Sequence, residues 1–189
     1  MIKSKEDLAF YLREDAKANI KRETCSWLRM QVNVWYGNDS YRFLQYMQAL
    51  RKYEYALNCL SGPVGKFRRI CAKVRFHKLG AKINVNILPN VVGYGFRVPH
   101  LVGGVIINCK SVGCKCTANA GVIVGNNNKG GMAVIGDNVD LCVGCKVIGG
   151  VHIGNNVIVG AGALIKDQNI PDNCIVFGQS PNLIIKSKK

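Results

Sequence analysis

The chain has 189 residues and a formal net charge of +15, from 26 lysines and arginines against 11 acidic residues. This length suits one domain with a small additional element and excludes a second enzyme domain. No apolar run approaches the length of a membrane span, and charges throughout the first fifteen residues are atypical of a secretion signal, so we expect a cytoplasmic protein.

The first 80 residues are predicted to be a helical region. Ser4 stands three residues before Asp7, a weak capping box that marks the start of one helix, and residues 40–60 have the pattern of a second, longer helix. The Ser-Gly-Pro run at 61–63 ends that second helix. Because a helical region of this size is too small for a rich core of its own, we expect it to pack against the rest of the chain or against a partner chain.

The segment from Lys66 to Lys82 carries seven lysines and arginines and no acid. An apolar stripe at helical spacing, made of Phe67, Ile70, Cys71 and Val74, predicts a basic helix. This helix is open to three functional interpretations: a nucleic-acid patch, contact with a membrane surface, or attraction of anionic ligands. The plainer interpretation is a linker helix that packs its stripe on the following domain. No DNA or RNA motif accompanies the segment, so we expect no nucleic-acid partner.

From Val112 to Ile165 the sequence repeats with a period of six residues. The first position is apolar in all hexads but one, the fifth is small or β-branched, and Gly and Asn are frequent at the corners. This period fits short strands joined by tight corners, in coils that bury apolar side chains by stacking. The sequence therefore predicts a mainly β chain, with a parallel β-helix at residues 81–189 and a small α-helical region at residues 1–80.

The nine cysteines are interpreted as free thiols. Cys116, Cys142 and Cys145 occupy small-residue positions of their hexads, where cysteine acts as a small hydrophobe. The CxC at Cys114 and the CxxC at Cys142 resemble zinc half-sites, but no second pair follows at the spacing of a zinc ribbon, so we expect no metal.

Two interruptions of the repeat are expected to carry function, because loops can leave a stacked scaffold without disturbing its core. Between Val124 and Ile135 a step of six residues becomes one of eleven, rich in Asn and Gly, with the single basic residue Lys129. The other interruption, residues 86–108, contains His100 between a proline and a Gly-Gly pair.

His100 is one of three histidines in the chain. His77 belongs to the basic helix, and His152 takes a hexad corner where we expect it to be solvated. A γ-class carbonic anhydrase would need three metal-binding histidines, two of them close in sequence, and this spacing does not provide them.

Several motifs around His100 resemble those of serine acetyltransferases, the hexapeptide acyltransferases of cysteine biosynthesis. The stretch VPHLVGGVIIN resembles their DHxTGxVxGE block, IGNNVIVGAGALI resembles IGxxxxIGAGSVV, and IPDNCIVFGQSPNLII resembles VPxxxxxxGxPAxxI. The resemblance covers about residues 83–185. It is stronger to the short members found in surface-polysaccharide gene clusters, whose helical region also has the pattern FLxxLRKxEYxxN before a basic helix.

The resemblance implies a left-handed β-helix, a homotrimer, acetyl-CoA as donor and one histidine as general base, a role that falls to His100. Asn119 or backbone amides are then expected to bind the oxyanion. The coenzyme is expected in a groove between neighbouring chains, where the lysines meet its phosphates. Its contacts are small or basic residues: Gly125, Lys129, Gly144, Ala161, Gly162 and Lys166.

The chain departs from the family at three positions. Asn86 and Leu88 stand where serine acetyltransferases carry an aspartate and a first histidine, and Asn119 stands where many other hexapeptide acyltransferases carry a histidine. A serine ammonium group thereby loses its best carboxylate partner, whereas neutral sugar hydroxyls suit the amides of Asn86, Asn108 and Asn119. We therefore expect an acetyl-CoA-dependent O-acetyltransferase acting on a saccharide or a polysaccharide precursor. L-Serine O-acetylation and a non-catalytic trimeric scaffold remain the alternatives, and the Lys66 to Lys82 segment keeps membrane-surface contact open.

Overall fold

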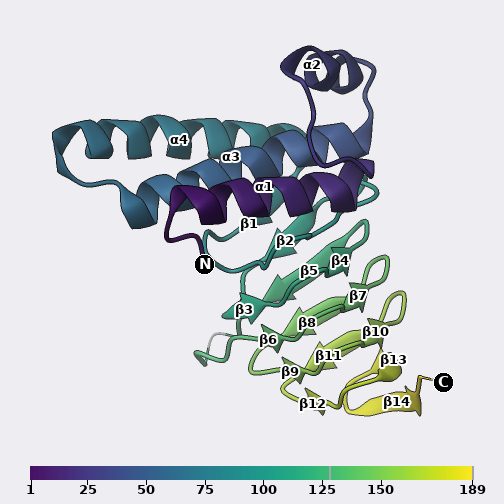
Figure 1. Ribbon diagram of the computed structural model, residues 1–189. Helices are drawn as coiled ribbons and strands as arrows, with labels where there is room; N and C mark the ends of the chain where they lie inside the picture. Colours follow the sequence, from purple (N-terminus) through teal and green to yellow (C-terminus); the bar gives the residue numbers. More distant parts are fainter. Residues whose placement is uncertain (128, 189) are drawn as a thin grey trace.

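The computed structural model describes residues 1–127 and 129–188 and shows a helical region above a solenoid of short strands (Figure 1). Four helices form the helical region: α1 (Lys5–Ile20), α2 (Trp27–Trp35), α3 (Asp39–Cys59) and α4 (Gly62–Ile83). α3 is central, since it packs against each of the other three. The chain then passes through Asn84 into the first strand of the solenoid.

The solenoid has three faces of parallel strands, and this confirms the predicted parallel β-helix with an N-terminal helical region. Strands related by one coil pair in register; Asn86, for example, pairs with Ile106, and Ile106 with Ile123. The first face is made of β1 (Val85–Ile87), β2 (Val105–Ile107), β5 (Val122–Gly125), β8 (Lys146–Ile148) and β11 (Leu164–Lys166). The second is β3 (Ser111–Val112), β6 (Val134–Ile135), β9 (His152–Ile153) and β12 (Asn169–Ile170). The third is β4 (Thr117–Ala118), β7 (Asp140–Leu141) and β10 (Ile158–Val159).

A hairpin closes the far end of the solenoid. β13 (Cys174–Gln179) pairs with β10 of the third face and touches β11 of the first, so it turns the last corner. β14 (Asn182–Ser187) returns antiparallel to β13 and ends the regular structure.

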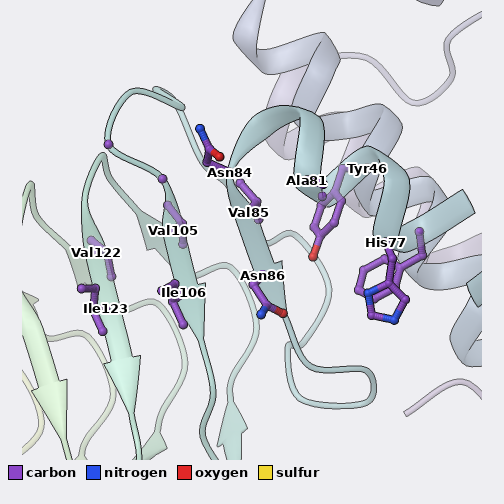
Figure 2. A pocket seen from close by; sticks show the side chains of 14 residues that line it. Tyr46, His77, Ala81, Asn84, Val85, Asn86, Val105, Ile106, Val122 and Ile123 are labelled. Carbon is purple, nitrogen blue, oxygen red and sulfur yellow. The ribbon is translucent and has the colours of Figure 1, made fainter. Parts of the chain in front are cut away.

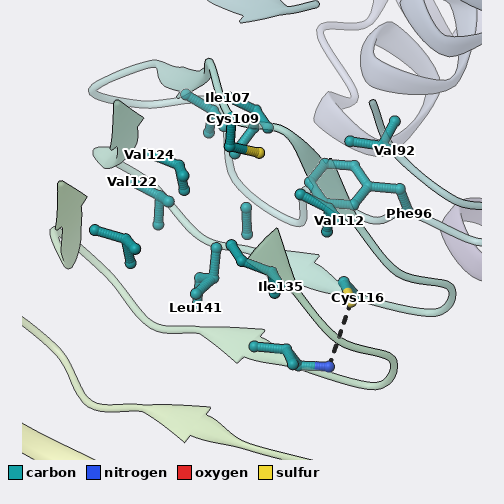
Figure 3. Close-up of a cluster of buried hydrophobic side chains, with 14 of the residues drawn as sticks. Val92, Phe96, Ile107, Cys109, Val112, Cys116, Val122, Val124, Ile135 and Leu141 are labelled. Atoms are coloured by element: carbon teal, nitrogen blue, oxygen red, sulfur yellow. Dashed lines mark hydrogen bonds between the residues drawn. The ribbon is translucent and has the colours of Figure 1, made fainter. Parts of the chain in front are cut away.

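Alternate residues of the strands point into the prism and form its core (Figure 3). Cys116 and Cys145 are fully buried there, which confirms them as small core residues. Burial raises the pKa of the Cys116 thiol to about 11 and that of Cys145 to about 12, so both stay protonated at neutral pH. Asparagines at the corners adopt the left-handed conformation and stack, as Asn138 does when its amide nitrogen donates to Asn156 at 2.8 Å.

A buried ion network joins the helical region to the first coil. Arg51 of α3 donates to Asp15 of α1 at 2.8 Å and to Glu54 at 3.0 Å, and also to the carbonyl oxygens of Val92 and Gly93. Burial acts to lower the pKa of Arg51, but the two carboxylates overcome it and raise that pKa, which keeps the guanidinium charged. The helices are therefore fixed on the open end of the solenoid by polar contacts as well as apolar ones.

Two features of the helical region differ from the sequence interpretation. α2 has no counterpart among the predicted helices, because nine residues give too short a pattern to stand out. The expectation that the basic helix packs its apolar stripe on the solenoid is wrong: Phe67 is 68% exposed and Ile70 61% exposed. α4 instead buries its opposite side, which carries Phe76 and Gly80. At the first turn of α1, the Asp7 amide donates to Ser4 Oγ at 3.0 Å, which confirms that cap.

Within the described residues, no helix is both long enough and apolar enough to cross a bilayer.

Candidate active site

The corner that carries His100 is three residues longer than the corner one coil below it. Arg97 pairs with Thr117 and Val105 pairs with Val122, so eight residue steps on one coil lie over five on the next. The extra residues leave His100 exposed at the surface. The loop is anchored at Leu101, which is buried and whose amide donates to Asp39 at the start of α3 at 3.2 Å.

Below this loop, one edge of the solenoid is built of stacked glycines. Gly121, Gly144 and Gly162 each have a positive φ and each donates a backbone hydrogen bond to the coil above, at 2.8 to 2.9 Å. No heavy atom lies within 4 Å of where a Cβ would stand on Gly144 or Gly162. We call this line, together with the neighbouring Asn119 and the exposed Ala161, the glycine edge. It is a line of solvent-accessible backbone that runs down this corner from the His100 loop, since Gly121 donates to Gly104 of that loop.

Asn119 lies on the glycine edge beside the end of the third face. Its side-chain nitrogen donates to the carbonyl oxygen of Leu141 at 3.2 Å, which fixes the side chain and leaves its second hydrogen for another acceptor. The structure therefore brings together five of the expected residues along one edge: His100, Asn119, Gly144, Ala161 and Gly162.

The other expected coenzyme contacts lie on the opposite edge of the first face. Gly125 and Lys166 stand at matching places at the ends of β5 and β11, because both pair with Ile148. Asn108, which was expected to bind the acceptor with Asn86, donates its amide to Val124 one coil below, at 2.8 Å, and so follows β2 at this same edge. Lys129 is exposed in the eleven-residue step that follows β5. We call this group the lysine edge: Asn108, Gly125, Lys129 and Lys166.

The two edges are too far apart to act on one thioester within a single chain. The strand from Gly121 to Gly125 separates them, a span of about 13 Å at about 3.3 Å per residue. Catalytic contacts need heavy atoms within about 3 Å. The predicted residues therefore lie along two separate edges, and one chain does not bring Lys129 or Lys166 to His100.

A cleft of about 590 Å³ lies on the first face, between α4 and the first three coils (Figure 2). Asn86 and Ile106 form its floor, and Gly103 and Gly104 of the His100 loop form its rim. Tyr46 contributes its ring, and Tyr46 Oη accepts a hydrogen bond from the Ile87 amide at 3.0 Å. His100 and Asn119 lie outside this lining. Volumes of this size are usual for small-molecule sites.

His77 is the lining residue that the sequence analysis did not select. It projects from α4 on the wall facing Asn86 (Figure 2). The sequence analysis placed His77 in the basic helix without a role, and only the packing of α4 over β1 reveals the cleft. Close backbone approach makes this fold possible, because a Cβ on Gly80 would lie 2.6 Å from the Val85 carbonyl oxygen. None of the described lining residues is acidic.

The described residues contain no group of three or more His, Cys, Asp or Glu side chains arranged to hold a metal ion.

Sequence comparison relates the chain to acyltransferases, although no family model matches it. It is 32% identical over 99 residues to serine acetyltransferase of Synechococcus elongatus, covering 51% of this chain and 40% of that one. It is also 32% identical over 104 residues to bifunctional protein GlmU of Neisseria meningitidis, covering 54% of this chain but 22% of that one. Similarity to serine acetyltransferase of Staphylococcus aureus is lower, 25% over 178 residues, but extends over 93% of this chain and 78% of the other.

Structure comparison leads to the same proteins. Serine acetyltransferase of Neisseria gonorrhoeae superposes with a TM-score of 0.68 at 20% identity, covering 97% of this chain and 67% of that one. A serine acetyltransferase in complex with CoA also gives 0.68, at 15% identity, covering 96% of this chain and 71% of that one. The chain resembles serine acetyltransferases. It shares their fold, and its sequence similarity to them reaches into the helical region, while it spans less than half of the Synechococcus protein.

Proposed function

We propose that the chain is an acetyl-CoA-dependent O-acetyltransferase of the serine acetyltransferase type, with His100 as its general base. The observation that carries the proposal is the lengthened corner, which places the exposed His100 at the head of the glycine edge. Stacked glycines offer a backbone surface without side chains, along which a narrow pantetheine arm can lie. Acetyl-CoA supplies an acyl group already activated as a thioester.

The chemistry assigned to His100 is proton removal from the acceptor hydroxyl. As neutral imidazole takes this proton, the hydroxyl oxygen attacks the thioester carbonyl and a tetrahedral oxyanion forms. The oxyanion collapses to an ester, the C–S bond breaks, and the imidazolium returns the proton to the departing thiolate. The free hydrogen of the Asn119 amide is the side-chain donor proposed for the oxyanion.

A homotrimer is proposed because the glycine edge and the lysine edge lie on opposite sides of one chain. In a cyclic assembly, the glycine edge of one copy meets the lysine edge of the next, and every interface holds one complete site. Lys129 and Lys166 would then meet coenzyme phosphates above the neighbouring copy's glycine edge. Light scattering should give about three times the 20.7 kDa chain mass.

For the acceptor, we propose a saccharide or polysaccharide precursor held in the cleft that contains Asn86, with its reacting hydroxyl beyond the Gly103-Gly104 rim at His100. The described lining offers amide and imidazole groups but no carboxylate, so a serine ammonium group would lie there without a charged partner. Sugar hydroxyls need only neutral donors and acceptors. L-Serine remains the second candidate, because the similar proteins include serine acetyltransferases.

Steady-state kinetics with L-serine and with a panel of neutral saccharides test the acceptor. We expect kcat/KM for serine to stay below about 10⁴ M⁻¹s⁻¹, the lower end of ordinary enzymes, and a saccharide to exceed it. Asn86→Asp provides the matched variant: a restored carboxylate should raise kcat/KM for serine and leave acetyl-CoA affinity unchanged. Efficient serine acetylation by the unaltered chain would reject the saccharide assignment. Absence of acetyl transfer to both classes, together with no acetyl-CoA binding, would favour the non-catalytic scaffold.

A further inference from the structure

The apolar stripe of α4 points away from the rest of the molecule. At about 100° per residue, Phe67, Ile70 and Val74 lie on one side of the helix, while the buried Phe76 and Gly80 lie on the other. Their exposed fractions are 68%, 61% and 47%. Large apolar side chains exposed in a continuous stripe indicate an interaction surface.

Basic side chains border this stripe on both sides. Lys66 and Lys73 lie along one margin, and Lys78 and Lys82 lie along the other, by the same helical projection. α4 contains no acidic residue, and none of its basic side chains forms an ion pair with a described residue. An apolar centre between two cationic margins is the pattern of a helix that lies in the surface of an anionic bilayer.

α2 carries a second exposed apolar surface. Trp27 and Trp35 are 75% and 81% exposed, and Leu28 lies between them in sequence at 66%, whereas Met30 is buried on the opposite side. Tryptophan favours the interface between water and lipid headgroups. Figure 1 shows α2 beyond α3, away from the coils of the solenoid, and α4 running beside α3 above β1.

We propose that α4 and α2 form a surface that binds anionic lipid bilayers. Charge complementarity selects this occupant: six exposed cations of α4 without ion-pair partners among the described residues suit an anionic surface, and the apolar stripe suits the acyl boundary beneath the headgroups. A nucleic acid would leave Phe67, Ile70 and Trp35 without an apolar environment. The proposal does not rest on the proposed activity, since it concerns α2 and the apolar stripe of α4, neither of which lines the cleft.

Sedimentation with vesicles tests the proposal, using the full chain. One set contains equal parts of phosphatidylglycerol and phosphatidylcholine, and the other contains phosphatidylcholine alone. We expect sedimentation with the first set only. The variant Phe67→Gln/Ile70→Gln/Val74→Gln should lower partitioning by at least about tenfold, since buried apolar area contributes to binding as well as charge.

Charge variants distinguish a specific surface from the high net charge of the chain. Lys66→Gln/Lys73→Gln/Lys78→Gln should weaken sedimentation, whereas the matched solenoid variant Lys110→Gln/Lys146→Gln/Lys188→Gln should not. All three sets of replacements are at exposed positions, and circular dichroism checks that each variant is folded. Equal loss in the two lysine variants would overturn the proposal, because binding would then follow net charge alone.

Tryptophan fluorescence reports α2 directly, since its two tryptophans are the only ones in the chain. We expect a shift of emission to shorter wavelength with the phosphatidylglycerol vesicles and none with phosphatidylcholine. No shift and no sedimentation would overturn the proposal. A second result would also overturn it: the variant Phe67→Gln/Ile70→Gln/Val74→Gln changes the oligomer mass in light scattering but not vesicle binding. The stripe would then contact another copy of the chain.

Discussion

The solenoid and the helical region are held together by different means. In the solenoid, the same contacts recur on every coil: a buried aliphatic or cysteine side chain inward, a backbone ladder between coils, and glycine or asparagine at the corner. In the helical region, position depends on single contacts that occur once, above all the Arg51 network. Repetition spreads stability over many equivalent sites, whereas the helical region concentrates it in a few.

The same contrast separates the uniform coils from the irregular features of the structure. The regular coils present uniform edges, and the distinctive features arise where the helical region meets the first coils. The His100 loop is tied to Asp39 of α3, and the cleft forms between α4 and β1. The helices thus add a cleft to the solenoid with little change to its repeat.

The largest expected effect on stability comes from the contact that occurs only once. Arg51→Ala leaves Asp15 and Glu54 buried without their partner and should lower the free energy of unfolding by about 3–5 kcal/mol, because breaking a buried ion network leaves uncompensated charge. Urea denaturation measures it. The adjacent exposed Lys52→Ala is the control and should change stability by less than about 0.5 kcal/mol. Equal effects in the two variants would contradict the assigned importance of the network.

Replacement of the proposed base should affect turnover and leave the fold intact. We expect His100→Ala to lower kcat by about 100-fold or more while acetyl-CoA still binds, because a general base stabilises the transition state and contributes little to donor affinity. His152→Ala is the matched control and should stay within about twofold, because His152 is exposed at the start of β9 and not at the corner that the sequence predicted. A His100 variant that keeps more than half of the unaltered kcat would exclude this role.

The glycine edge should respond to a bulky side chain in its coenzyme affinity. Ala161→Trp should raise KM for acetyl-CoA by about tenfold, equivalent to about 1.4 kcal/mol, by filling the space beside Gly162. Lys188→Trp, on the C-terminal hairpin, should leave KM unchanged. If the two variants behave alike in initial-rate measurements, the pantetheine arm does not follow this edge.

Stability at alkaline pH should reveal the buried thiols of the solenoid. Burial raises the pKa of Cys145 to about 12, so the native chain holds this proton above the ordinary thiol range, and the unfolded chain releases it. The stabilisation is complete below about pH 8.5 and falls as pH rises, by about 2 kcal/mol per buried thiol at pH 10. Urea denaturation between pH 8 and pH 10 should show a shallower decline in Cys145→Ala. The exposed Cys71→Ala should leave the slope unchanged, and a shared slope would refute the assignment.

The sequence predicts the structure of the solenoid better than that of the helical region. A period of six is a local signal that is repeated many times. The sequence alone therefore predicts the coils, the residues at their corners and the eleven-residue step at Lys129. The sequence showed that one side of α4 is apolar. It did not show whether that side is buried, because burial depends on contacts between residues that are distant in sequence. His77, Asn86 and Gly103 are far apart in sequence, and only the packing of α4 on the first face brings them to one cleft.

The division of the site into two edges was also beyond sequence reasoning. The resemblance supplied residues for one coenzyme groove, and the strand register then placed Gly144 and Gly162 on one edge but Gly125 and Lys166 on the other. Periodicity indicates which residues point outward, but the assignment to edges requires the pairing of coils.

Mixed assemblies test most directly the central claim that each active site combines the glycine edge of one copy with the lysine edge of the next. His100→Ala removes the base from the first edge, and Gly125→Trp blocks the second, where the space beyond the glycine admits a side chain. Each variant alone should be inactive. Co-expressed in equal amounts, random trimers should recover about one quarter of the unaltered acetyl-transfer rate, since one interface in four pairs two intact edges. Recovery below about 1% in mixed trimers of confirmed composition would place the complete site within one chain and contradict this account.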